Sequence, residues 1–113
     1  MFLYFLFLYI YMNTKVTLYH ANWCGHCKNF LPQWNALTNF LEKHNIDYED
    51  FEDSSNPDVM QQQNIQAFPT IKISKNNQIY EYNGERTVDG IINELGIQNG
   101  GSKSSKFYIK YSN

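Results

Sequence analysis

The sequence has little cysteine: Cys24 and Cys27 are the only two among its 113 residues. A small secreted protein built on a disulfide framework needs more of them. A disulfide between these two would enclose Gly25 and His26 alone, which constrains the unfolded chain very little. The scarcity of cysteine therefore argues against a small protein stabilised mainly by disulfides, and the close pair needs another explanation.

A large excess of charge of either sign is also missing. The formal net charge is −2, the sequence pI is about 5.8, and no dense run of Lys or Arg occurs. Nucleic acids and anionic membranes attract strongly basic surfaces, so we expect no nucleic-acid partner. The 113 residues allow one small domain with a modest core, which we expect to be a monomer.

A long hydrophobic run is missing as well. Residues 1–12, "MFLYFLFLYIYM", carry no charge, but a helix of this length spans about 18 Å of a hydrocarbon core roughly 30 Å thick. The segment lacks the basic start and the small-residue cleavage site of a signal peptide. Three interpretations of residues 1–13 stay open: a leader or interfacial anchor with membrane contact, the end of a longer hydrophobic segment, or an edge strand.

Residues 14–97 have the pattern of one α/β domain. Runs rich in β-branched and aromatic residues predict strands, and apolar residues at three- and four-residue steps predict helices. The order is β-α-β-α-β-β-α, a mixed sheet flanked by helices, with strands at 15–21, 45–51, 67–74 and 78–82 and helices ending near 43, 64 and 96. Because the first two connections cross over through a helix, we expect the first three strands to be parallel and the last hairpin antiparallel.

Single residues mark the expected helix boundaries. Asn56 followed by Pro57 is typical of a helix start, and Thr87 can cap the last helix. Gly96 is expected to end that helix, and Pro32 to kink the first one. Beyond them, residues 98–113 combine linker-like "NGGSKSS" with "KFYIKYSN", which predicts a flexible tail or, alternatively, a strand that binds a partner.

The two cysteines are placed where a strand gives way to a helix. The free N–H groups and the dipole at a helix start stabilise an anion, and the thiolate is the reactive form of cysteine. Cys24 is therefore expected to be the nucleophile, and Cys27 lies three positions further, on the same helical face. Cys27 could attack a mixed disulfide formed at Cys24 and release the partner, which is thiol–disulfide exchange.

Zinc binding is the alternative use of such a pair. A structural zinc site wants four ligands, and the histidines that could complete one, His20, His26 and His44, do not follow a zinc-binding spacing. An inert buried pair is a further alternative. We expect no metal site.

Several motifs around the cysteines agree with one another. "WCGHCK" resembles the active-site motif of protein disulfide isomerase domains within the thioredoxin superfamily, with Trp23 before the pair and Lys28 after it. Pro32 stands at the place of that family's kink proline, and "FPTIK", with Pro69, resembles its cis-proline loop. "YNGERTVDGI" resembles the segment that carries an arginine, here Arg86. The resemblance extends over about residues 15–97.

The resemblance implies a thioredoxin-like fold and a set of site residues. Cys24 would be an exposed nucleophile and Cys27 the resolving thiol, so that the Cys24–Cys27 disulfide is the redox group and no further cofactor is expected. Pro69 would be cis and, with Phe68 and Trp23, form the edge that binds a substrate peptide.

Other residues in the motifs are expected to adjust the chemistry. His26 stands between the cysteines and is expected to favour the reduced form, which makes the disulfide more oxidising. Gly25 and Arg86 are expected to tune the cysteines, Arg86 by lowering the pKa of Cys27, although a solvated surface charge is the alternative for Arg86. The sequence departs from the family at Leu18, where a buried carboxylate is usual, and in having too few residues before 14 for the usual first strand and helix.

The predicted function is that of a thiol–disulfide oxidoreductase, of the isomerase or oxidase kind, acting on protein cysteines. The alternative is a thioredoxin-fold module that binds peptides with little or no turnover. Leu18, which replaces the usual buried carboxylate, leaves room for this alternative. The upstream redox partner is not identified by the sequence. The expected location is the secretory pathway, the endoplasmic reticulum or a membrane surface, with cytoplasm or virion as the alternative.

Overall fold

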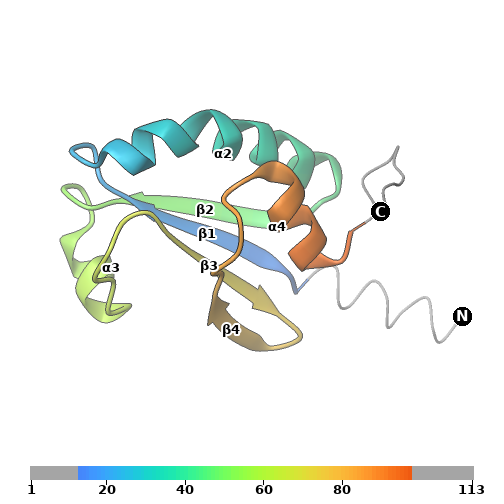
Figure 1. Cartoon of the computed structure of the whole chain (residues 1–113). Coiled ribbons are helices and arrows are strands. Elements are labelled where there is room, and N and C mark those ends of the chain that lie inside the picture. Colours follow the sequence, from blue (N-terminus) through green and yellow to red (C-terminus); the bar gives the residue numbers. More distant parts are fainter. Residues whose placement is uncertain (1–12, 98–113) are drawn as a thin grey trace, which may run out of the picture.

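The computed structural model describes residues 13–97, so the assignments for residues 1–12 and 98–113 lie outside the described residues. Figure 1 shows the order predicted from the sequence, strand-helix-strand-helix-strand-strand-helix. The elements are β1 (Lys15–His20), α2 (Gly25–Lys43), β2 (Asp47–Glu52), α3 (Pro57–Gln62), β3 (Thr70–Lys75), β4 (Gln78–Glu81) and α4 (Val88–Leu95). This is the predicted thioredoxin-like α/β fold.

The strands form one mixed sheet in the order β2-β1-β3-β4. β1 and β2 are parallel, and the β3–β4 hairpin is antiparallel, as predicted. The expectation that β3 is also parallel is wrong, because β3 runs antiparallel to β1. The reason is the length of α3: six residues rise only about 9 Å, too little to return along the sheet, so β3 starts at the end where β2 finishes (Figure 1).

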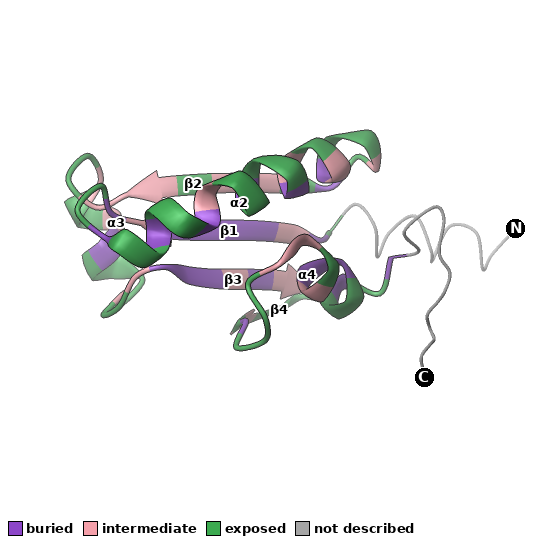
Figure 2. Ribbon diagram, turned by 45° about the horizontal axis from the view of Figure 1, so that its top comes forward, coloured by how far each residue is buried: buried purple, intermediate pink, exposed green. Residues whose placement is uncertain are grey.

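The main core lies between the sheet and the two helices α2 and α4. Val16 and Leu18 point from β1 toward these helices and are fully buried. The three- and four-residue steps predicted for α2 put Trp34 and Leu37 into this core, and the outer side of α2 is exposed (Figure 2). The other buried members are Phe30, Leu41, Ile46, Ile71, Ile73, Tyr82, Ile91, Ile92, Leu95 and Ile97.

Two of the expected helix boundaries are confirmed in detail. Thr87 caps α4, since its Oγ1 accepts the N–H of Gly90 at 3.0 Å, and Gly96 ends it at a φ of 76°. Asn56 precedes α3, but its side chain makes no cap and instead donates to the Glu52 carbonyl at 3.1 Å. Within residues 13–97, every helix is too short or too polar to cross a membrane.

Candidate active site

Cys24 occupies the junction between β1 and α2, as the sequence predicted. Its backbone is extended, with φ −92° and ψ 116°, and its Sγ accepts the N–H of Cys27 at 3.2 Å. The N–H of Cys24 donates to the Ala21 carbonyl at 3.1 Å. The sulfur is therefore the N-cap of the helix, at the position where unpaired N–H groups favour an anion.

The two thiols are more enclosed than expected. Cys24 is 6% exposed and Cys27 2%, so the expectation of an exposed nucleophile is wrong. Ala21 and Phe68 pack around the pair and supply the cover. Both cysteines are free thiols, and the Cys24 thiol donates to the Phe68 carbonyl at 3.5 Å.

The residues expected to bind a substrate lie together beside Cys24. The Phe68–Pro69 peptide bond is cis, as the resemblance implied, and Pro69 is buried. The ring of Phe68 meets that of Trp23 edge-on, with centroids 5.7 Å apart. Trp23 is 69% exposed, which leaves a large apolar surface next to the thiols. The fold thus brings Trp23 to a residue 45 positions further along the chain.

Cys27 has an environment that disfavours its thiolate. The pKa of the Cys27 thiol is raised to about 11, mainly by burial and then by the hydrogen bond with Cys24. The Ala21 backbone and the Arg86 guanidinium act in the opposite direction and lower it. Arg86 is exposed, yet its charge acts on Cys27 in the predicted direction. Leu18 is fully buried in the apolar core, and it supplies no proton acceptor.

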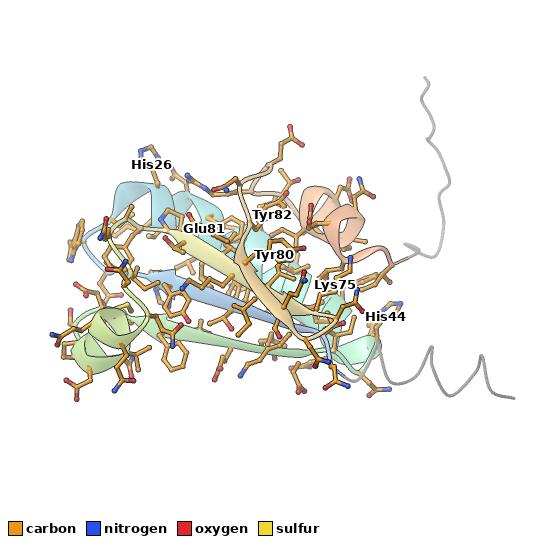
Figure 3. All side chains as sticks on the ribbon, turned by 90° about the horizontal axis from the view of Figure 1, so that it is seen from below. His26, His44, Lys75, Tyr80, Glu81 and Tyr82 are labelled. Atoms are coloured by element: carbon orange, nitrogen blue, oxygen red, sulfur yellow. The ribbon has the colours of Figure 1, made fainter. Side chains whose placement is uncertain are left out.

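The two residues between the cysteines are both exposed. His26 projects away from the domain at the start of α2 (Figure 3). A Cβ added at Gly25 would meet no atom within 4 Å, so space alone does not require glycine there. Their expected influence on the cysteines stays a prediction. Among the side chains of residues 13–97, no group of three His, Cys, Asp or Glu is arranged to hold a metal ion.

Sequence reasoning missed the part that the backbone and β2 play at this site. The carbonyls of Phe68 and Ala21 both accept hydrogen bonds from Cys24, and such backbone contacts cannot be predicted from residue types. Glu52 was not among the predicted site residues, but its carboxylate accepts the N–H of Asn22 at 3.0 Å. The parallel pairing of the first two strands was the available signal, since it places the end of β2 beside the start of the cysteine loop.

Comparison with known proteins places this geometry in context. The family model "Thioredoxin" matches residues 11–96. Protein disulfide-isomerase of Ricinus communis is 36% identical over 91 residues, which cover 75% of this chain and 18% of that protein. Protein disulfide-isomerase of Saccharomyces cerevisiae is 35% identical over 77 residues, which cover 66% of this chain and 15% of that protein. The chain thus spans less than a fifth of the length of these relatives.

A solved structure gives the same result for the fold. The first thioredoxin domain of mouse protein disulfide-isomerase A4 superimposes with a TM-score of 0.63 at 26% sequence identity. The match covers 83% of this chain and 70% of that one. Human ERp44 in its zinc-bound form superimposes with a TM-score of 0.67 at 17% identity, which supports the fold alone.

Proposed function

The chain belongs to the thioredoxin family, and from that premise we propose that it exchanges disulfides with protein cysteines, as an oxidoreductase of the disulfide-isomerase kind. The observation that supports this most strongly is the pairing of the cysteines at the start of α2. Cys24 Sγ lies 3.2 Å from the N–H of Cys27, so the nucleophile and the resolving thiol occupy one helical turn. The exposed ring of Trp23 gives a substrate peptide an apolar surface beside them.

The reaction proceeds in two steps that conserve electrons. The Cys24 thiolate attacks one sulfur of a substrate disulfide, which forms a mixed disulfide and releases the other substrate sulfur as a thiolate. The Cys27 thiolate then attacks Cys24 Sγ, closes the Cys24–Cys27 disulfide and releases the second substrate sulfur. The substrate gains two electrons that the dithiol loses, and the reverse sequence delivers a disulfide to a substrate dithiol.

The relatives support the proposed substrates, and redox chemistry supports the proposed compartment. The matched relatives are named as protein disulfide-isomerases, which supports protein thiols and disulfides as the substrates of this chain. Structural disulfides form and persist in oxidising compartments, so we place the protein in the secretory pathway. Fractionation of cells that express the full chain tests the location, and recovery with cytosolic markers would overturn it.

Insulin reduction and refolding of scrambled ribonuclease test the activity itself. We expect the wild-type chain to turn over in both assays and the Cys24→Ser/Cys27→Ser double variant to show no rate above buffer. If wild type and double variant behave alike but both bind the unfolded substrate, the chain is a peptide-binding module and not an enzyme.

A further inference from the structure

The two faces of the sheet are covered unequally. α2 and α4 pack on one face, where Val16 and Leu18 of β1 are fully buried. Because side chains alternate along a strand, Thr17 and Tyr19 point toward the second face. Only α3 lies on that side, beneath the end of the sheet where β1 finishes (Figure 1). In the part of the chain that the structure describes, the end where β1 begins has no helix over its second face.

A groove runs along this second face. A cavity of about 350 Å³ lies over Thr17 and Tyr19 and extends to Lys15 at the start of β1. Phe51 of β2 also lines it, and its ring stacks on that of Tyr19 with the centroids 5.7 Å apart. A second cavity of about 500 Å³ lies between the end of α3 and β4. The two cavities share three lining residues, which are Gln63, Lys72 and Ile79.

Ile79 leaves an apolar side chain in water at the border of this groove. Its side chain is 71% exposed, and among residues 13–97 only Trp23 is a large apolar residue of comparable exposure. Ile79 pairs with Ser74, which in turn pairs with Lys15, so Ile79 stands at the end of the sheet where β1 begins. An exposed isoleucine beside a groove indicates a surface that another segment covers.

The charged residues of the smaller cavity are satisfied within the domain. Lys15 forms an ion pair with Glu49 between β1 and β2. Lys72 Nζ donates to the Gln63 carbonyl at 3.1 Å and lies 5.9 Å from the centroid of the Tyr19 ring. Because each charge has a partner, an occupant needs no charge of its own. The groove therefore suits an uncharged segment.

Residues 1–12 are an uncharged segment that joins the domain at this groove. They are apolar or aromatic throughout, and only Asn13 and Thr14 separate them from β1. Asn13 lies in a turn, so the chain changes direction just before the strand. Twelve residues in a helix are about 18 Å long, and the six residues of β1 are about 20 Å long. A segment that turns back at Asn13 can therefore cover the groove along the length of β1.

We propose that residues 1–12 fold back onto the second face of the sheet and fill the groove beside Thr17, Tyr19 and Ile79. The driving force is the removal of apolar surface from water, both on the segment and on Ile79. The segment is then part of the domain and completes a second core beneath the sheet. A second copy of the chain and a lipid surface are the competing occupants, and they predict different results in the test below.

Photocrosslinking from the groove tests the contact. The full chain with p-benzoylphenylalanine in place of Ile79 is irradiated at low concentration, digested with trypsin and analysed by mass spectrometry. We expect coupling to the tryptic peptide 1–15, which ends at the first lysine, in a product that stays monomeric on a denaturing gel. The matched control carries the same amino acid at Gln78, which is exposed on the other side of β4, and it should give no such product.

Three results overturn the proposal. A product of dimer size assigns the groove to a second copy of the chain. With vesicles of phosphatidylcholine and phosphatidylserine present, coupling to lipid in place of peptide 1–15 assigns the segment to the membrane. Irradiation that gives no product with peptide 1–15 shows that the segment does not occupy the groove. If p-benzoylphenylalanine disturbs β4, Ser74 takes its place, since it lies opposite Ile79 on β3 and lines the same cavity.

A charge placed within the segment gives an independent measurement on the full chain. Leu6→Glu should lower the urea midpoint of unfolding, because its carboxylate would enter the groove or force the segment out of it. Asn39→Glu, on the exposed outer side of α2, is the control and should leave the midpoint unchanged. A leader or a membrane anchor makes no contribution to the stability of the domain. An unchanged midpoint for Leu6→Glu therefore overturns the proposal.

Discussion

At the scale of single residues, the burial of Cys27 determines how fast a mixed disulfide is resolved. Only the thiolate attacks, and the pKa of Cys27 is raised to about 11, so the reactive fraction at neutral pH is small. We load Cys24 with glutathione and follow the release of glutathione by stopped flow. Its rate should rise about tenfold for each pH unit from 7 to 10. A rate that levels off below pH 9 would show that Cys27 ionises far more easily than its burial implies.

Leu18 offers a second prediction at this scale, because it leaves the buried side of β1 without a proton acceptor. We expect Leu18→Glu to speed turnover at neutral pH while lowering the free energy of unfolding, since a carboxyl group then enters the apolar core. Leu18→Gln is the matched control, because it is polar and of similar size but cannot accept the thiol proton. A folded Leu18→Glu variant no faster than Leu18→Gln would show that another group or water takes the proton.

His26 is predicted to set the redox potential of the pair. A cationic or hydrogen-bonding imidazole at the start of α2 would stabilise the Cys24 thiolate and favour the reduced form. The wild-type potential should lie nearer that of protein disulfide isomerase, about −180 mV, than that of thioredoxin, about −270 mV. Equilibration in glutathione buffers should give His26→Pro a lower redox potential than wild type. His26→Ala is the control, because it removes the ring without adding proline. A wild-type value near that of thioredoxin, or no downward shift in His26→Pro, would make the histidine incidental.

At the scale of elements, the helix boundaries were readable from the sequence because they depend on local chemistry. Thr87 was predicted as a cap and makes the hydrogen bond, so Thr87→Ala should lower the free energy of unfolding by about 1 kcal/mol. Urea unfolding measures it. Thr38→Ala within α2, where the hydroxyl donates to the Asn35 carbonyl, is the control and should cost less. Equal losses would mean that the cap contributes nothing of its own.

The direction of β3 could not be read in the same way. Its sequence predicts a strand, but whether that strand is parallel depends on how far α3 carries the chain, and α3 is only six residues long. The enclosure of Cys24 has a similar origin, because Phe68 lies 44 residues away and reaches the thiol only through the folded loop. Periodicity and spacing predict elements and motifs, whereas these two features depend on tertiary geometry.

At the scale of the whole molecule, the fold and the position of the dithiol were predictable because several local signals agreed. The strand before Cys24, the amphipathic pattern of α2 and the Phe68–Pro69 motif all point to one architecture, and the structure has it. The contacts of the Ala21 carbonyl with Cys24 and of the Glu52 carboxylate with Asn22 were not predictable from residue types, since each involves a main-chain group. Only the predicted parallel pairing of β1 with β2 indicated that these segments lie together. The central claim is that this assembly exchanges disulfides in two steps, with Cys24 first and Cys27 second.

Mass spectrometry of the mixed disulfide tests that claim most directly. The Cys27→Ser chain is mixed with a disulfide-bonded peptide at neutral pH and quenched in acid. It should carry one peptide on Cys24, because attack is intact and resolution is blocked. Wild type should show no lasting adduct, and Cys24→Ser should react far more slowly. Adducts that form preferentially on Cys27, or a Cys27→Ser chain that forms none, would contradict the account.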